Sequence, residues 1–260
     1  MNLDLASLMP WAQDALWAGF AVFLRVGAML SLVPAFGEQS VPPRLKLVLA
    51  IAFTLVILPA ADPLIGVAPT ALPSLLMVCG AEILAGLLFG LMLRLFVLAL
   101  QIAGTIAAQS TSLSQLFGGG PGTEPAPAIG HLLVISGLAL IAILGLHVRL
   151  AALMIQSYAL IPHGSLPSAS VVADAGLREI TRCFTLAFTL SAPFVVASLI
   201  YNIALGVINR AMPQLMVAFV GAPAITAGGL FLLLISAPIM LSLWSGNLNA
   251  FMDNPFGALP

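Results

Sequence analysis

Charged residues are scarce in this sequence. Only 7% of the 260 residues are Asp, Glu, Lys or Arg, against about 25% in an average soluble domain. Hydrophobic residues make up 61%, and the mean hydropathy is +1.16. A chain with so few charges cannot cover a globular surface with solvated groups, so it needs lipid or protein around it. With a net charge of −1, the sequence gives no sign of a basic surface that would bind nucleic acid.

Basic residues are missing from the first 24 positions, where Asp4 and Asp14 are the charged groups. A cleavable signal peptide begins with a basic region, so the sequence predicts none, and the first apolar run should stay in the protein. Cysteine is also rare. Cys79 and Cys183 both lie in apolar runs, which favours small buried hydrophobic side chains over a disulfide or metal role.

Enzyme motifs are absent as well. The sequence has no HExxH, no GxSxG and no Walker loop, and the glycines 118–120 lack the Lys-Ser/Thr of a phosphate loop. His131, His147 and His163 are sixteen residues apart, which turns them to different helix faces, and none has a second ligand at metal spacing. We therefore expect a protein that is not an enzyme, with no catalytic, cofactor-binding or metal-binding residue and no cofactor.

Long apolar stretches are what the sequence does contain. A membrane-spanning helix needs about 20 apolar residues, and an open sheet edge in lipid would leave backbone groups unpaired, so we expect an all-α membrane protein. The first, third, sixth and seventh stretches are long enough to span, the fourth is borderline, and the second and fifth are short enough to be partial, re-entrant or packed helices. The seven stretches are 11–33, 45–58, 75–108, 129–146, 150–161, 177–208 and 222–243.

Proline and the basic residues complicate this pattern. Pro193 and Pro238 lie inside long apolar runs and predict kinks. Arg44 and Lys46 place the loop 34–46 in the cytoplasm by the positive-inside rule. The loop near Gly120 would then also be cytoplasmic, yet it has no Lys or Arg, so either one stretch does not span or partners fix the topology.

The third stretch carries a polar stripe. At about 100° per residue, its polar side chains fall close to one line along the helix. On the same stretch, Gly86 with Gly90, and Ala99 with Ala103 and Ala107, have the small-residue spacing that lets helices approach closely in membranes. The stripe either makes hydrogen bonds to another helix or faces a water-filled passage. Its members are Arg94, Gln101, Thr105 and Ser112.

Charges inside apolar runs are the next candidates for function. Arg25, Glu82 and Arg94 indicate salt bridges to partner subunits or snorkelling near a helix end, and a proton or ion path is the alternative. Glu179 and Arg182 have the spacing of a local ion pair, which we interpret as a solvated or headgroup-level helix start.

Three sequence motifs lie in order along the chain. Residues 23–50 read FLRVGAMLSLVPAFGEQSVPPRLKLVLA, with an Arg in the first helix, a Pro-x-Phe-Gly turn and a Val-Pro pair. Residues 145–164 read GLHVRLAALMIQSYALIPHG, with a Gly-x-His start, a Ser-aromatic pair and a Pro-x-Gly ending. Residues 208–226 read INRAMPQLMVAFVGAPAIT and contain an Asn-Arg-Ala-x-Pro-Gln motif. In order and spacing these motifs resemble the FliR family of flagellar export-apparatus membrane proteins, and the resemblance covers essentially the whole chain.

The resemblance implies a structural subunit of the type III flagellar protein export gate, in the bacterial inner (cytoplasmic) membrane at the flagellar basal body. The implied partners are FliP-like and FliQ-like subunits, FlhB-like and FlhA-like export proteins, unfolded flagellar export substrates and membrane lipid. The implied fold is a single membrane domain of kinked helical hairpins within a spiral hetero-oligomer. Residues 1–175 would form a FliP-like portion, and residues 176–260 a FliQ-like helical hairpin.

The resemblance also assigns roles to residues. In FliR-like proteins a loop after the third helix plugs the pore, and here that role falls on Leu113, Leu116, Phe117, Gly118, Gly119 and Gly120. This loop lacks the Asp-Pro common in the family, and an ordinary connector is the alternative. Partner or structural roles fall on Arg25, Glu82, Asn209, Arg210, Pro213 and Gln214. For the whole chain, the alternatives are a stand-alone transporter or channel and the homologous subunit of a virulence injectisome.

Overall fold

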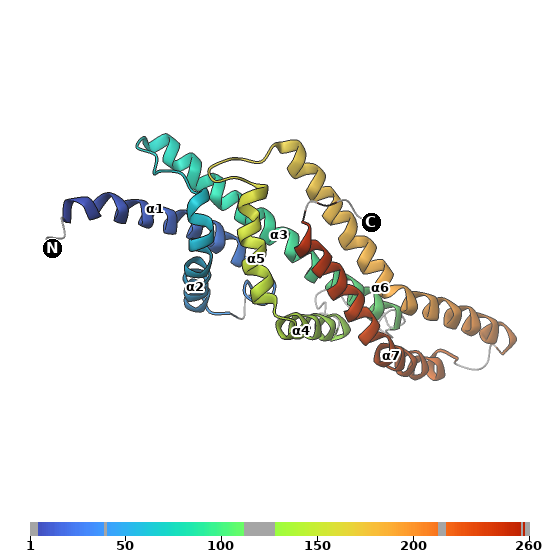
Figure 1. The fold of residues 1–260 in the computed structure, drawn as a ribbon. Helices are drawn as coiled ribbons and strands as arrows, with labels where there is room; N and C mark the ends of the chain where they lie inside the picture. Colours follow the sequence, from blue (N-terminus) through green and yellow to red (C-terminus); the bar gives the residue numbers. More distant parts are fainter. Residues whose placement is uncertain (1–4, 39–40, 112–127, 213–216, 256, 258–260) are drawn as a thin grey trace. The chain divides into compact units, whose positions relative to one another are not determined.

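The structure is a computed structural model that describes residues 5–38, 41–111, 128–212, 217–255 and 257, with the backbone alone for 5–11, 217–220 and 222. Within these residues every regular element is a helix, which confirms the all-α prediction (Figure 1). The elements are α1 (Leu5–Leu30), α2 (Pro43–Ala61), the 3-10 helix η1 (Asp62–Leu64), α3 (Leu72–Thr111), α4 (Ala128–Ile143), α5 (Leu146–Leu160), α6 (Ala169–Ala211) and α7 (Val217–Asp253).

Four helical segments in the described residues are long and apolar enough to cross a membrane, and the short pair α4 and α5 can add a fifth span. They are 43–64, 72–111, 169–211 and 223–253. The expectation for the second stretch was wrong, because α2 begins at Pro43, where the fixed φ of proline suits a helix start, and continues beyond Pro59. The first stretch was expected to span, but α1 is not among the four, since Asp14 and Arg25 lower its hydropathy.

The internal prolines do not end their helices. α6 continues through Pro193, and α7 continues through Pro223 and Pro238. Each proline removes one backbone hydrogen-bond donor from its helix. The kinks that we expect there remain a prediction.

The chain divides into two compact units. The first comprises residues 1–94, 142–177 and 250–260, and so holds α1, α2, α5 and the first half of α3. The second comprises 95–141 and 178–249 and holds the second half of α3 with most of α4, α6 and α7. This division by compactness groups 95–141 with the C-terminal helices. The FliP-like and FliQ-like division near residue 175 stays a prediction.

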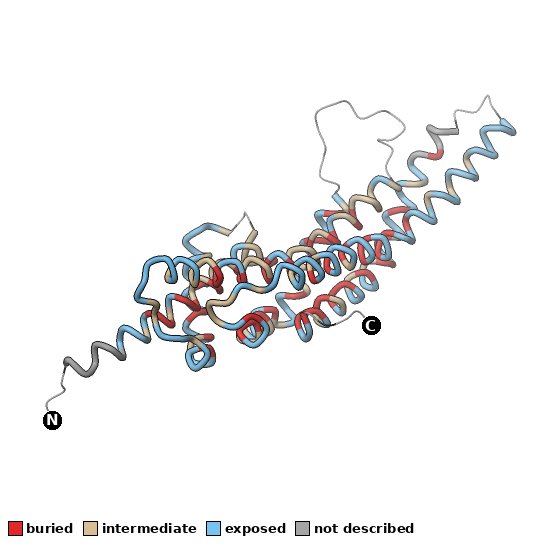
Figure 2. Tube along the Cα trace, turned by 90° about the horizontal axis from the view of Figure 1, so that it is seen from above, coloured by how far each residue is buried: buried red, intermediate tan, exposed pale blue. Residues whose placement is uncertain are grey.

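Each unit has its own buried core, to which α3 contributes together with α1 and α5 in the first unit and with α4, α6 and α7 in the second. Figure 2 shows the buried residues in red along the chain. In the second unit, Ala99, Ala103 and Ala107 are fully buried, which confirms that the small-residue face of α3 serves helix packing. Cys183 is buried there, as predicted, whereas Cys79 in the first unit is only half-buried; both are free thiols.

Candidate functional site

Two glycines bring α3 into direct backbone contact with α1. A Cβ atom on Gly90 would lie 2.8 Å from the carbonyl oxygen of Met29, and one on Gly86 would overlap the carbonyl oxygen of Arg25. Real Cβ atoms do not come this close to a backbone oxygen, so only glycine fits at both positions. The predicted close approach at Gly86 and Gly90 is therefore confirmed, with α1 as the neighbour.

This contact places Arg25 beside Glu82, one turn earlier on α3. The Arg25 guanidinium binds the carboxylate with two nitrogens, Nε to Oε2 at 2.7 Å and Nη2 to Oε1 at 3.2 Å. The Arg25 side chain is 2% exposed and that of Glu82 is 0% exposed. Two parallel hydrogen bonds between opposite charges give the pair both strength and a fixed orientation.

Helix α5 supplies the next layer of the cluster. Arg25 Nη1 donates to the hydroxyl of Ser157 at 3.2 Å and to the carbonyl of Ile161 at 3.0 Å. The guanidinium carbon also lies 3.8 Å from the centre of the Tyr158 ring, a cation–π contact. Every nitrogen of Arg25 therefore has a partner, and α1, α3 and α5 are joined at one point.

The turn after α5 completes the other side of Glu82. The backbone N–H of Gly164 donates to Oε1 at 2.9 Å, and Nδ1 of His163 lies 2.9 Å from the same oxygen. Gly164 has φ +68°, a conformation that glycine adopts without strain. The turn thus presents both a donor and an imidazole to the buried carboxylate.

The cluster stabilises the packing of α1, α3 and α5 against one another. Removing one partner of a buried ion pair costs about 3–5 kcal/mol, because the other charge is left buried and unpaired. We had expected partner subunits or lipid headgroups to meet Arg25 and Glu82. In the structure the two residues bind each other, and their role in the assembled protein stays a prediction.

Arg94, the first member of the polar stripe, pairs with Glu38 in the connection between α1 and α2 at 2.5 Å, with side chains about one quarter exposed. Lys46 donates to the carbonyl of Gly37 in the same connection at 2.9 Å. Further along α3, Thr105 donates to the carbonyl of Gln101 in its own helix, and Gln101 is exposed. Ser112 lies outside the described residues. The stripe is thus split between the ion pair of Arg94 and the exposed Gln101 with the half-buried Thr105.

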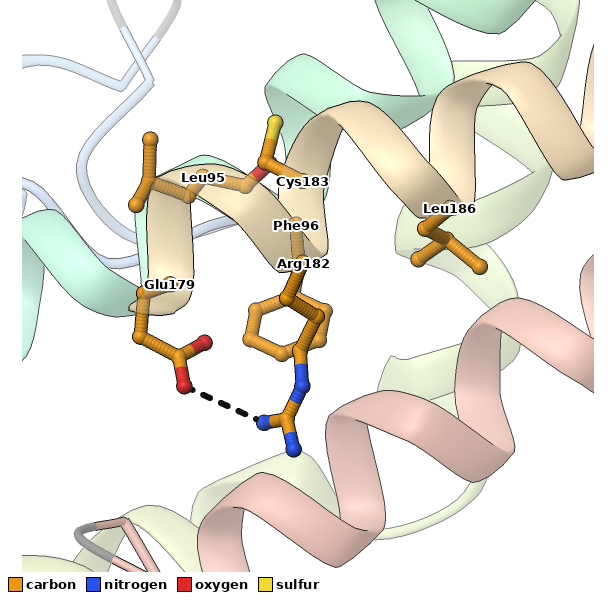
Figure 3. Close-up of a pocket in the computed structure, with 6 residues that line it drawn as sticks. All are labelled: Leu95, Phe96, Glu179, Arg182, Cys183 and Leu186. Atoms are coloured by element: carbon orange, nitrogen blue, oxygen red, sulfur yellow. Dashed lines mark hydrogen bonds and ion pairs between the residues drawn. The ribbon is translucent and has the colours of Figure 1, made fainter. Parts of the chain in front are cut away.

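A second ion pair lies in the other unit, on α6. Arg182 Nη1 donates to Glu179 Oε1 at 3.2 Å, and Figure 3 shows both groups extending to the same side of the helix beside Leu95 and Phe96 of α3. Their side chains are 12% and 8% exposed. The interpretation as a solvated helix start was wrong, because α6 begins ten residues earlier, at Ala169, and the pair falls on its buried face.

This second pair is less complete than the first. Glu179 Oε2 and Arg182 Nε are buried and have no hydrogen-bond partner in the described part of the chain. A buried polar atom without a partner costs about 1–3 kcal/mol. In the Arg25 cluster, Tyr158 Oη and His163 Nδ1 are also buried without a hydrogen-bond partner in the described residues, but the charged atoms of Arg25 and Glu82 are all bonded. The Arg25–Glu82 pair is therefore the more completely bonded of the two ion pairs.

The remaining candidate residues divide into two sets. Asn209 and Arg210 are exposed in the last turn of α6, where a cation can interact with free carbonyls. Pro213, Gln214 and the plug residues Leu113, Leu116, Phe117, Gly118, Gly119 and Gly120 lie outside the described residues. Among the residues that the structure describes, no group of three His, Cys, Asp or Glu side chains could hold a metal ion.

Sequence reasoning missed three members of the Arg25 cluster. Ser157 and Tyr158 are the Ser-aromatic pair of the second motif, and His163 lies inside its Pro-x-Gly ending. Those motif positions were the available signal. Their link to Arg25 could not be read from the sequence, since more than 130 residues separate Arg25 from Ser157.

Taken together, these features define an all-helical membrane protein whose buried charges serve to join its helices. Comparison with known proteins gives the family. Residues 16–251 match the family model described as "Bacterial export proteins, family 1". "Flagellar biosynthetic protein FliR" of Caulobacter vibrioides is 32% identical over 233 residues, which cover 89% of this chain and 93% of the relative. The proteins of that name from Aquifex aeolicus and Escherichia coli are each 28% identical, over 88% and 89% of this chain.

The chain therefore belongs to the FliR family of bacterial export proteins, a family of flagellum biogenesis and protein export.

Proposed function

We propose that the chain is a structural subunit of the flagellar type III export gate in the bacterial inner membrane, at the flagellar basal body. It assembles there with FliP-like and FliQ-like subunits and with FlhB-like and FlhA-like proteins, and unfolded flagellar subunits pass through the assembly. The observation that carries this proposal is the family match over residues 16–251, together with relatives named as flagellar biosynthetic proteins over nine-tenths of the chain.

The surface of the long helices supports an assembled state. The most apolar part of α3 is 56% buried within the chain, whereas the corresponding parts of α6 and α7 are 33% and 22% buried. α6 and α7 thus leave most of their apolar surface for lipid or other subunits. Close packing of small residues and hydrogen bonds are what join helices in membranes.

The Arg25 cluster supports a structural role over ion transport. A stand-alone transporter would also place a charge pair within one chain, as Arg25 and Glu82 do. Such a transporter needs an ionisable group that exchanges its partner during transport. Here Arg25 Nε, Nη1 and Nη2 are all bonded, and Glu82 accepts from Arg25 and Gly164. These hydrogen bonds leave neither side chain free to exchange its partner, which favours a structural role.

The segment from Ser110 to Pro127 is proposed as the plug of the channel, although its first two residues still belong to α3. It contains four glycines and three prolines, with Leu113, Leu116 and Phe117 on the way in from the end of α3. Apolar side chains at a constriction exclude ions by keeping it dry, and glycines give the backbone freedom to move aside. A loop of this composition suits a channel that passes a chain and holds back ions.

Shortening the segment tests the plug. Deletion of Leu116 to Gly122 in an assembled complex should raise ion leak across the membrane while the complex stays intact. A second variant keeps the length of the segment and replaces Leu113, Leu116 and Phe117 with Ser. It should also leak, because water then enters the constriction. A complex that stays intact and tight to ions in both variants would identify the segment as an ordinary connector.

A further inference from the structure

The C-terminal half of α6 is exposed on most of its surface. From Leu199 to Arg210, every residue except Tyr201 and Leu205 is exposed, and Figure 2 shows this end of the helix mostly in pale blue. The Tyr201 hydroxyl donates to the carbonyl of Gly221 in α7, and a Cβ atom on Gly221 would lie 3.1 Å from Cδ2 of Leu205. α7 therefore packs against the side of α6 that carries Tyr201 and Leu205, and the rest of this half is left for lipid or another subunit.

Asn202 lies in this exposed part, within the apolar run 194–208. It is about 100° around the helix from Tyr201, so α7 does not cover it. Within the residues that the structure describes, its amide makes one hydrogen bond, from Nδ2 to Oγ of Ser198 at 3.2 Å. The oxygen Oδ1 and the second N–H are left over. Lipid hydrocarbon offers them no partner, and an unpaired amide there is unfavourable. Asn202 therefore favours contact with a protein over contact with lipid.

Arg210 gives a second, independent observation two turns further along α6. It is the only charged residue between Arg182 and Asp253 in the sequence, and it is exposed in the last turn of the helix. None of the ion pairs among the described residues includes it. Asn202 and Arg210 are eight residues apart, which is about 12 Å along the helix axis. α6 thus presents an amide and a cation at a fixed spacing, and both need partners from outside the described chain.

We propose that this face of α6 packs against an apolar helix of a neighbouring subunit, an inference that rests on the export-gate role proposed above. We define the face as Asn202, Gly206, Asn209 and Arg210, which lie within about 100° of one another around the helix. The partner helix carries a hydrogen-bonding side chain, such as that of Ser, Thr, Asn or Gln, opposite Asn202, because such pairs join helices in membranes. It carries a carboxylate opposite Arg210, about 12 Å further along.

A phospholipid fits this face less well than a helix does. Its phosphate could bind Arg210, since arginine binds phosphates and carboxylates alike. With Arg210 at the level of the phosphate, Asn202 lies about 12 Å deeper, where a bilayer offers hydrocarbon and no hydrogen-bonding group. One lipid headgroup therefore cannot satisfy both residues, whereas one helix can.

The face can be tested without disturbing the packing of the chain itself. A Cβ atom on Gly206 would meet nothing within 4 Å, so Gly206→Leu obstructs only what lies outside the chain. Ala204 is also exposed and lies on the side of α6 opposite Asn202, so Ala204→Leu is the matched control. Asn202→Leu removes the amide. Its control is Thr189→Val, because the exposed Thr189 is polar but its hydroxyl already donates to the carbonyl of Thr185 at 2.8 Å.

The experiment expresses the chain together with the other subunits and measures how much assembled complex is recovered in mild detergent per amount of chain in the membrane. Asn202→Leu should lower recovery about threefold, the effect of one hydrogen bond between membrane helices, and Gly206→Leu about tenfold, because the added side chain keeps the helices apart. Thr189→Val and Ala204→Leu should match the wild type. Wild-type recovery from both face variants, or equal losses from face variants and controls, overturns the proposal.

A photoreactive side chain identifies what covers the face in a chain that keeps Asn202 and Gly206, so the proposal can be tested even where a substitution prevents folding. Benzoylphenylalanine replaces Leu199, which is 59% exposed and lies within about 60° of Asn202 around the helix. The proposal predicts a cross-link to a subunit helix that has a hydrogen-bonding side chain and a carboxylate two turns apart, as mapped by mass spectrometry. A phospholipid adduct, or no adduct to protein, overturns it.

This inference and the export-gate role fail separately. If the wild-type chain is recovered with FliP-like and FliQ-like proteins but the cross-link goes to lipid, the helix contact fails and the export-gate role stands. If the cross-link goes to such a helix in a protein unrelated to export, the helix contact stands and the export-gate role fails.

Discussion

Gly86 lies against the backbone carbonyl of Arg25, one helical turn along α3 from Glu82, the residue that binds the Arg25 side chain. The same arginine is thus held to α3 twice, by its backbone and by its charge. The close approach comes first in physical terms, because the carboxylate can reach the guanidinium only when the two helices touch.

Gly86→Ala should therefore disrupt the α1–α3 contact. The added methyl group overlaps a backbone oxygen that cannot turn away, so α1 must shift and the Arg25–Glu82 hydrogen bonds lengthen. We expect a loss of about 1–3 kcal/mol of stability, measured as a lower midpoint of thermal unfolding of the purified complex. Gly80→Ala on the same helix is the control, since its Cβ atom meets nothing within 4 Å. Equal behaviour of the two variants would contradict this account of the contact.

Replacing one residue of the buried Arg25–Glu82 pair should destabilise the protein more than replacing both. Arg25→Met alone and Glu82→Leu alone each leave one uncompensated buried charge, at a cost of about 3–5 kcal/mol. The double variant removes both charges and should be much less destabilised than the sum of the single variants, as measured by membrane accumulation and thermal unfolding.

The exposed pair of Arg149 and Asp253 is the comparison for this prediction. Its atoms are 3.5 Å apart, and its side chains are 42% and 74% exposed. Arg149→Ala should cost less than about 1 kcal/mol. Additive losses in the Arg25 and Glu82 double variant would show that the two residues do not act as a pair.

Arg210 and Pro213 should matter for assembly. Arg210 is exposed at the end of α6, where partner subunits can reach it, and Pro213 belongs to the same sequence motif. We expect Arg210→Ala and Pro213→Ala to reduce the yield of the assembled complex more than they alter ion leak through the complexes that form. Yield is measured by affinity purification, with Arg178→Ala, another exposed arginine of α6, as the control. Wild-type yields from both variants would argue against the role in assembly.

The sequence predicts that the helices exist because each of them contains an apolar run, but the run does not always give the ends of the helix. Pro43 shows the limit, because it lies between the first two apolar stretches and forms the first turn of α2. Gly86 and Gly90 could be recognised as a contact face from their spacing, although nothing in the spacing names α1 as the partner. Helix periodicity predicts on which face of its helix a residue lies, but it does not predict which other helix packs against that face.

The charged sites were harder to predict for the same reason. Arg25 and Glu82 were each recognised as unusual within an apolar run, but their mutual hydrogen bonds depend on the fold. Glu179 and Arg182 were assigned to a solvated helix start because the apolar run begins at Leu177. The helix begins at Ala169, so the pair lies three turns inside it. The helix begins eight residues before the apolar run, in a stretch of small residues and valines that also contains Ser170 and Asp174.

We expect this chain to work as one subunit of an export gate and not on its own. The most direct test is to tag the chain at its natural level of expression, purify it in mild detergent, and identify by mass spectrometry what accompanies it. The account predicts a complex that contains FliP-like and FliQ-like proteins, and a chain that does not persist without them. A stable, monodisperse monomer that carries out its own transport after reconstitution into vesicles would contradict it.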